Sequence, residues 1–180
     1  MVDVGYEDQK SRYVFSELNE DFIQLSTFID EPRVFLKVCA AAGEVEQVVP
    51  GKWTIQPQAY MMSCFHPMNI ADSNLQEEYR LEFDNYNSTF VVRILTREGV
   101  LASGGRVVLV NDLAVYDRIE TDSQHRRKGL AGFLMKELEK IALSNGVFKN
   151  FLVATEEGRS LYQSLGWEIY SLYTSIVMPG

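Results

Sequence analysis

A basic stretch that contains glycine offers the clearest chemistry in this sequence. Arg126, Arg127 and Lys128 stand in a row, and Gly129 follows them. Glycine lets backbone N–H groups approach an anion closely, and a helix that starts here would add unpaired N–H donors and a positive dipole end. The stretch therefore predicts a site for a phosphorylated ligand.

The same stretch could instead be a solvated loop that caps a helix, as most charge runs are. The composition favours the ligand. The protein has 25 acidic and 17 basic residues and a formal net charge of -8, so three consecutive basic residues are unusual for its composition. An acidic chain gains little from general attraction to nucleic acid or anionic lipid. A discrete anion is therefore the better candidate.

The elements on either side of the basic stretch fit this role. Apolar residues from Leu130 to Ala142 recur at spacings of three and four, which predicts an amphipathic helix that stops near Gly146. Strands are expected at 113–121 and at 151–154. This order is a crossover that makes the two strands parallel, with the basic turn at the carboxyl end of the first, where open α/β sheets bind ligands.

The remaining pattern predicts a mixed α/β (α+β) sheet, in which an antiparallel meander leads into this crossover. Further strands are expected at 79–83, 89–95 and 105–110, with turns at 84–87, 98–99 and 111–112. A helix at 156–165 and an extended stretch at 167–178 follow the crossover. The portion before about residue 78 is expected to be helix-rich and irregular, with helices at 19–29 and 34–42 and a strand at 53–62.

Length and composition favour one cytoplasmic domain. The 180 residues are 46% hydrophobic, which is enough for a single core. No apolar run approaches the ~18 residues of a membrane span, and the start lacks the basic and apolar regions of a signal peptide. Cys39 and Cys64 are too few for a disulfide framework, and the two histidines lack metal-ligand spacing, so we expect reduced thiols and no metal.

Two motifs give the chain a resemblance to the GCN5-related N-acetyltransferase (GNAT) superfamily. The family's acyl-CoA motif is Arg or Gln, two residues, Gly, one residue, then Gly or Ala, and it matches Arg126 to Ala131. The family's Leu-Tyr-x-x-x-Gly-aromatic segment matches Leu161 to Trp167. The resemblance covers about residues 89–178. It implies a GNAT-like acyl-CoA N-acyltransferase fold over 1–180, with a variable acceptor-side portion at 1–78 and an acetyl-CoA-binding core at 79–180.

The resemblance also implies a cofactor, acetyl-CoA, in a gap where the strands at 113–121 and 151–154 splay apart. The backbone N–H of Ile119 would face the thioester oxygen and stabilise its developing charge. The implied cofactor-binding residues are Ile119, Thr121, Arg126, Arg127, Lys128, Gly129, Leu130, Ala131, Gly132 and Thr155. The chain departs from the family at Thr155 and Gly158, where many members have Asn and Ala, and in a compressed last hairpin at 167–178.

By motif position, Tyr162 is the implied general acid, because a phenol with a reference pKa near ~10 can reprotonate a coenzyme A thiolate. The alternative is a core tyrosine with a satisfied hydroxyl. Asp117 and Glu120 are candidates for the base that deprotonates the amine. Side chains alternate across a strand, so Asp117 should share a face with Ile119 and Glu120 should not, unless a bulge reverses the count. Asp117 is therefore favoured, against the alternative of a carboxylate paired with Arg118.

The expected function is N-acetylation of a primary amine by direct attack in a ternary complex. A non-catalytic acyl-CoA-binding regulatory module is the alternative, and a nucleic-acid-binding domain is disfavoured by the acidic balance. We expect a small-molecule or peptide amine as partner, with no nucleic acid and no membrane, and a homodimer stays open. Residues that could line an apolar acceptor pocket, or could simply be core, are Trp53, Tyr60, Met61, Met62, Phe65 and His66.

Overall fold

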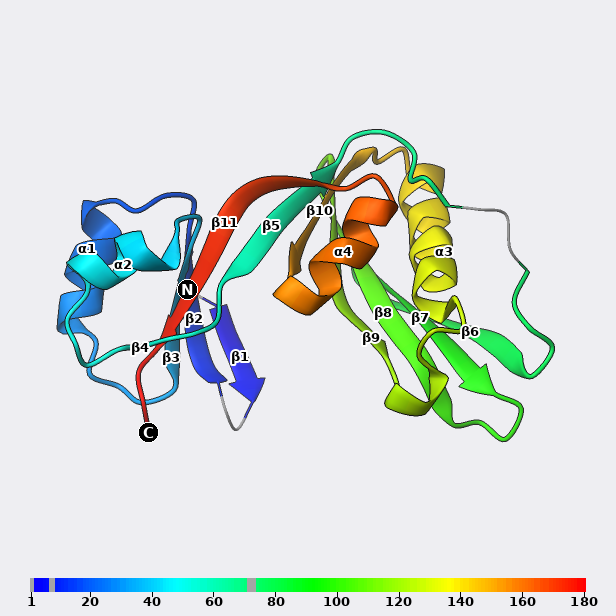
Figure 1. The fold of residues 1–180 in the computed structure, drawn as a ribbon, viewed down its shortest axis with the longest axis horizontal. Coiled ribbons are helices and arrows are strands. Elements are labelled where there is room, and N and C mark those ends of the chain that lie inside the picture. Colours follow the sequence, from blue (N-terminus) through cyan, green and yellow to red (C-terminus); the bar gives the residue numbers. More distant parts are fainter. Residues whose placement is uncertain (1, 7–8, 71–73) are drawn as a thin grey trace. The chain divides into compact units, whose positions relative to one another are not determined.

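The computed structural model describes residues 2–6, 9–70 and 74–180, which divide into two compact units. Unit 1 contains the described residues up to Met61 together with Ala154–Glu157 and Ile169–Gly180, and unit 2 contains Met62–Val153 and Gly158–Glu168. Figure 1 shows the helices and strands of both. Among the described residues, no helix is long and apolar enough to cross a membrane.

Unit 1 is a small sheet with two helices. Its strands are β1 (Val2–Tyr6), β2 (Gln9–Phe15), β3 (Val34–Val38), β4 (Thr54–Ile55) and most of β11 (Glu168–Val177), and its helices are α1 (Glu20–Phe28) and α2 (Ala42–Val48). β2 and β3 are parallel, and β11 runs antiparallel to both β3 and β4. Phe22, Leu36 and Ile176 form part of a core that excludes solvent from these elements.

The structure confirms one predicted helix in this region and corrects the rest. α1 begins where expected, because the Asn19 side chain accepts a hydrogen bond from the Phe22 N–H at 3.1 Å. The predicted helix at 34–42 is wrong, since β3 occupies its first half. Alternate residues from Val34 to Val38 are buried, a two-residue period that suits a strand flanked by β2 and β11. The portion before residue 78 is therefore rich in strands rather than helices.

The strand predicted at 53–62 is two strands, β4 and β5 (Ala59–Cys64). Pro57 lies in the interruption between them. Proline has no N–H to donate to a ladder, which explains why pairing stops on either side of it.

Unit 2 confirms the predicted meander and crossover. Its strands are β6 (Tyr79–Tyr86), β7 (Thr89–Thr96), β8 (Leu101–Val110), β9 (Leu113–Thr121) and most of β10 (Lys149–Ala154). Its helices are the 3-10 turn η1 (Ser123–His125), α3 (Leu130–Ser144) and most of α4 (Glu156–Ser164). β6 to β9 are successively antiparallel, and β9 and β10 are parallel. The mixed α/β class predicted from the sequence is confirmed, with element ends shifted by a few residues.

α3 packs against one face of this sheet, where β7 and β8 lie behind it in Figure 1. Leu130, Leu134 and Leu138 are buried on the side of the helix that faces the sheet. Gly105 on β8 lies under the helix, because a Cβ there would stand 3.3 Å from Leu134 Cδ2 and only 2.4 Å from Ile119 Cδ1. The absence of a side chain at Gly105 therefore makes room for Ile119.

Adjacent glycines on β8 allow a matched test of this packing. We expect Gly105→Ala to lower the free energy of unfolding by about 1–3 kcal/mol, because the methyl group must displace Ile119 and crowd Leu134. Gly104→Ala is the control, since its Cβ would meet Leu101 Cδ1 at 3.6 Å, an ordinary contact. Urea unfolding measures both, and equal destabilisation would contradict the packing described.

Candidate functional site

The parallel strands β9 and β10 separate before they end. They pair from Leu113 with Lys149 as far as Tyr116 with Leu152, but β9 continues to Thr121 and β10 to Ala154. At the paired end, the Tyr116 hydroxyl donates to Asn150 Oδ1 at 3.2 Å, and these two side chains are buried. The last five residues of β9 thus lie outside the ladder with β10, as a gap between splayed strands requires.

A bulge in β9 determines which side chains face each way. Gly104 pairs with Glu120 and Arg106 pairs with Asp117, so two residues of β9, Arg118 and Ile119, stand opposite one residue of β8. Arg118 has a φ of 54°, in the left-handed region that a bulge can require.

The bulge corrects the simple count of alternating side chains. Ile119 lies over Gly105 on the α3 side of the sheet. Asp117 and Glu120 stand opposite Arg106 and Gly104, which flank Gly105 on its strand and therefore face the other way. Asp117 and Glu120 share one face, and Ile119 does not share it with either.

The predicted anion site is the start of α3. Gly129 occupies the N-cap position with a φ of 76°, and Arg127 has a φ of 59°. No side chain caps the helix, and the first helical N–H to bond within it is that of Phe133, to the Gly129 oxygen at 3.1 Å. The N–H groups of Leu130, Ala131 and Gly132 therefore have no acceptor within the helix, which is the arrangement that binds phosphates.

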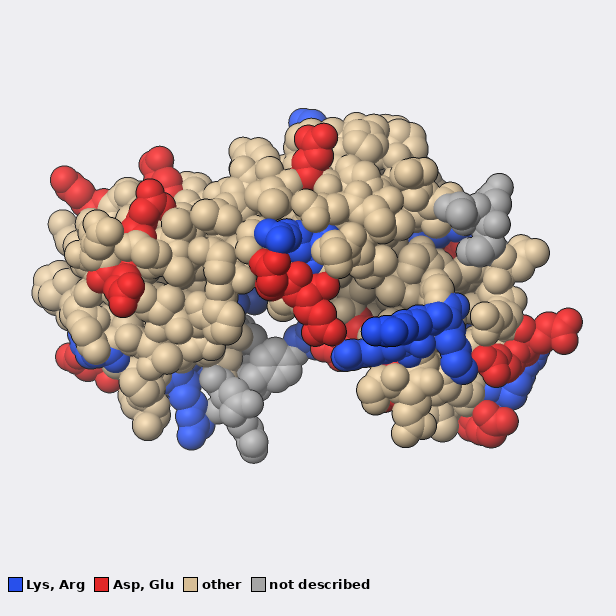
Figure 2. All heavy atoms as spheres, in the orientation of Figure 1, with Lys and Arg blue, Asp and Glu red and all other residues tan. Residues whose placement is uncertain are grey.

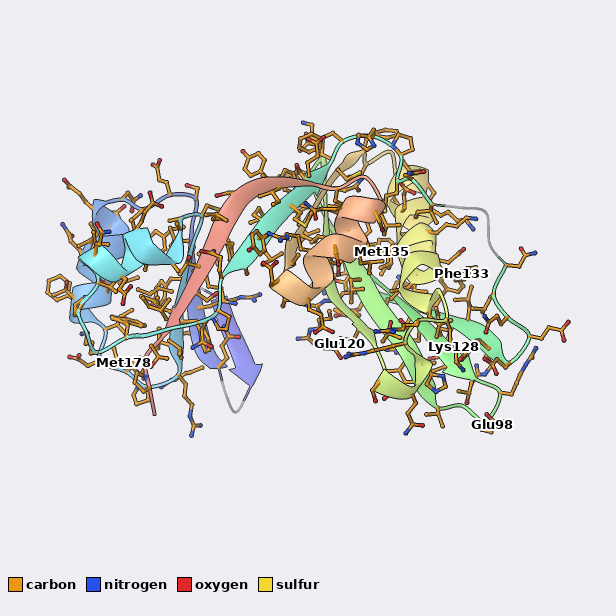
Figure 3. All side chains as sticks on the ribbon, in the orientation of Figure 1. Glu98, Glu120, Lys128, Phe133, Met135 and Met178 are labelled. Atoms are coloured by element: carbon orange, nitrogen blue, oxygen red, sulfur yellow. The ribbon has the colours of Figure 1, made fainter. Side chains whose placement is uncertain are left out.

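The three cations of this turn do not have equal roles. Lys128 Nζ donates to the Tyr79 hydroxyl at 3.0 Å and approaches Glu78 Oε1 at 3.3 Å. These hydrogen bonds, that with Tyr79 first, raise the pKa of Lys128. Arg126 Nε lies 3.4 Å from the Thr121 oxygen, and Arg127 is exposed. Figure 2 shows basic side chains gathered over the start of α3, and Figure 3 labels Lys128 there.

Tyr162 on α4 is buried, and its ring lies 6.2 Å from that of Trp167. Trp167 in turn meets the ring of Tyr116 edge-on at 5.3 Å. Burial raises the pKa of Tyr162 to about 12, so the phenol stays protonated at neutral pH. Among the described residues, no hydrogen-bond partner of the Tyr162 hydroxyl is found, so the alternative of a satisfied core phenol is not what the structure shows.

The two candidate carboxylates differ in their partners. Asp117 Oδ2 accepts from Arg106 Nε at 3.0 Å and from its Nη2, and Asp117 Oδ1 accepts from the Arg118 N–H at 2.8 Å. Partial burial acts to lower the pKa of Arg106, but hydrogen bonds to Asp117 and Tyr86 together outweigh it and raise that pKa. Glu120 is exposed and forms no ion pair with a described residue. Asp117 is thus the paired carboxylate, with Arg106 as its main partner.

A hollow lies on the sheet face that carries Glu120. Its volume is about 520 Å³, and residues of unit 2 line it. Gly104 and Gly105 of β8 lie between Arg93 of β7 and Glu120 of β9, and Tyr86 and Leu101 complete part of the wall. Sequence reasoning missed the hollow, because only the strand register brings these residues together. Figure 3 shows Glu120 on β9.

The predicted apolar acceptor residues are divided between the two units, with Trp53, Tyr60 and Met61 in unit 1 and the other three in unit 2. Trp53 is in the core of unit 1 and donates from Nε1 to the Ser26 oxygen at 2.8 Å. Met62 is fully buried, so both are core residues. Phe65 packs against Phe151 with their ring centroids 5.5 Å apart, and His66 lies against Gly166. Thr155 follows β10 in unit 1, whereas the other predicted cofactor-binding residues are in unit 2, and its role stays a prediction.

Comparisons with known proteins agree with this geometry. The model of the acetyltransferase (GNAT) family matches residues 57–167, more than half of the chain. No curated protein sequence matches the chain significantly.

Solved structures share the fold at low sequence identity. A GCN5-related N-acetyltransferase from Kribbella flavida has a TM-score of 0.59 at 14% identity, over 82% of this chain and 68% of that one. A GCN5-related N-acetyltransferase-like protein from Streptococcus suis has a TM-score of 0.62 at 15% identity, over 91% and 78%. A tandem GNAT protein from the clavulanic acid biosynthesis pathway has a TM-score of 0.64 at 12% identity, over 86% and 66%.

Proposed function

Because the chain belongs to the acetyltransferase (GNAT) family, we propose that it transfers an acetyl group from acetyl-CoA to a primary amine by direct attack in a ternary complex. The observation that carries this proposal is the early separation of β9 and β10 beside the uncapped start of α3. Acetyl-CoA would supply an activated thioester. We also propose that the protein works in the cytoplasm.

The residues around this gap fit such a cofactor. The N–H groups at 130–132 and the exposed Arg127 suit a pyrophosphate. Lys128 would contribute through its backbone, since its ammonium group is hydrogen-bonded to Tyr79 and Glu78. Beyond Tyr116, the backbone of β9 is outside the ladder with β10, so the N–H of Ile119 and the backbone of Thr121 could pair with an extended ligand.

The transfer requires two proton movements. The amine nitrogen must lose a proton as it forms a bond to the acetyl carbon, and the departing sulfur must gain one as the carbon–sulfur bond breaks. Tyr162 would give the second proton, because its buried phenol is protonated at neutral pH. Glu120 would take the first, directly or through water, since it faces the hollow without an ion pair to a described residue.

Asp117 suits a positioning role better than a basic one. Its carboxylate already accepts hydrogen bonds from the Arg106 side chain and from the Arg118 backbone. The contact with Arg118 spans the bulge, so Asp117 stabilises the backbone turn that orients Glu120 and Ile119.

Release of free thiol distinguishes the enzyme from a binding module. With acetyl-CoA and a panel of primary amines, we expect thiol release that depends on both protein and amine. Binding of acetyl-CoA without amine-dependent release would favour the non-catalytic acyl-CoA-binding alternative. Calorimetry with acetyl-CoA alone supplies the binding measurement.

Replacement of the phenol should separate chemistry from binding. We expect Tyr162→Phe to lower kcat by about 100-fold while acetyl-CoA affinity changes little, because only the proton donor is lost. With a pKa of about 12, the wild-type phenol should cause no loss of activity below about pH 11. Tyr170→Phe, at an exposed tyrosine, is the control. Unchanged turnover in Tyr162→Phe would reject its role as the acid.

The two carboxylates can be compared by isosteric substitution. We expect Glu120→Gln to lower kcat/KM by about 100-fold at pH 7 and to recover part of it as the pH rises, because more of the amine is then unprotonated. Asp117→Asn should cost less than about 10-fold, with a pH profile like that of the wild type. A larger loss in Asp117→Asn than in Glu120→Gln would assign the base to Asp117.

A further inference from the structure

The hollow on the face opposite α3 contains more than a candidate base. Its lining holds one arginine from each of three successive strands, Arg93, Arg106 and Arg118, and the acids Glu120 and Asp122. A volume of about 520 Å³ is within the range of small-ligand sites. The chemistry of its charged groups therefore bears on which amine it would accept.

The strand register explains why the hollow exists and how its charges are arranged. Arg93 pairs with Gly104, and Gly104 pairs with Glu120, so the three residues lie in one row across β7, β8 and β9. Neighbouring strands are about 5 Å apart, which sets the outer two Cα atoms about 10 Å apart. Because Gly104 has no side chain, the row is open in its middle, with a cation on one side and an anion on the other.

The next row closes the hollow on one side. Arg106 stands opposite Asp117 and donates to it, and it also donates to the Tyr86 hydroxyl at 3.0 Å. The guanidinium of Arg106 is therefore already hydrogen-bonded to groups of the protein. Arg106 is therefore a wall of the hollow rather than its main ligand group.

Arg93 is held more loosely than Arg106. Its Nη1 lies 3.3 Å from Glu82 Oε1 and its Nη2 lies 3.8 Å from Asp84 Oδ2, and all three side chains are at least one-third exposed. Surface pairs of this kind contribute at most about 1 kcal/mol. A ligand carboxylate, which can accept two parallel hydrogen bonds from a guanidinium, could replace them at little cost.

We propose that the acceptor is a small amine that also carries a carboxylate. Its amine lies beside Glu120 and its carboxylate binds Arg93, above the space left by Gly104. The proposal rests on the proposed function, since it names the substrate class of that same site. A plain amine would leave Arg93 without a ligand anion, and an amine-free carboxylate would face Glu120 with like charge.

Pairs of acceptors that differ only in the carboxylate test the substrate class. 4-Aminobutyrate is compared with butylamine, and lysine with 1,5-diaminopentane, by kcat/KM for acetyl-CoA-dependent thiol release. We expect the carboxylated member to be favoured by at least about tenfold in at least one pair. That preference should fall to about twofold or less in Arg93→Gln. It should persist in Arg80→Gln, where the arginine lies on β6 outside the hollow.

A binding measurement keeps this inference separate from the proposed function. 4-Aminobutyrate or lysine should raise the Tm of the wild type and of Arg80→Gln without acetyl-CoA. Neither should raise the Tm of Arg93→Gln or of Gly104→Val, whose side chain would occupy the open middle of the row. If no amine releases thiol, the proposed function fails, and the Tm shifts still decide this inference. Equal use of both members of every pair, or a preference that survives Arg93→Gln, would overturn it.

Discussion

The bulge in β9 is the constraint on which the site depends. One extra residue opposite Gly105 turns Ile119 toward α3 and sets Asp117 and Glu120 together on the other face. The same region is where β9 leaves the ladder with β10. In a regular strand, side chains would alternate without interruption and the ladder with β10 would continue. Such a strand would provide neither an open backbone nor two carboxylates on the same face.

Adjacent glycines on β8 serve this arrangement in different ways. Gly105 faces α3 and has no side chain because Ile119 fills the space above it. Gly104 faces the hollow, where a Cβ would meet only ordinary contacts, so no packing requirement excludes a side chain there. One glycine is explained by the fold. The other leaves the space between Arg93 and Glu120 open.

The sequence predicted the elements that local chemistry determines. Gly129 lies at a left-handed N-cap, and β9 has its predicted ends. α3 ends at Ser144 with Asn145 as its C-cap, close to Gly146, where the pattern placed the stop. The failures have non-local causes. The segment that starts at Val34 became a strand because β2 and β11 flank it, and the bulge at Arg118 depends on pairing with β8. The residue types of one strand alone predict neither the strand at Val34 nor the bulge at Arg118.

The sequence also could not predict which charged side chains form pairs within the protein. Composition and spacing indicated a basic turn, but they could not show that Lys128 is bonded to Tyr79 and Glu78, or that Arg106 engages Asp117. Tyr79 and Lys128 are 49 residues apart in the sequence, and Arg106 and Asp117 lie opposite each other on the neighbouring strands β8 and β9. Once these partners are assigned, Arg127 stays exposed at the start of α3 and Glu120 stays exposed over the hollow. The folded chain thus neutralises some charges of each cluster internally and leaves others to face a ligand, which is a distinction that only the tertiary pairing can make.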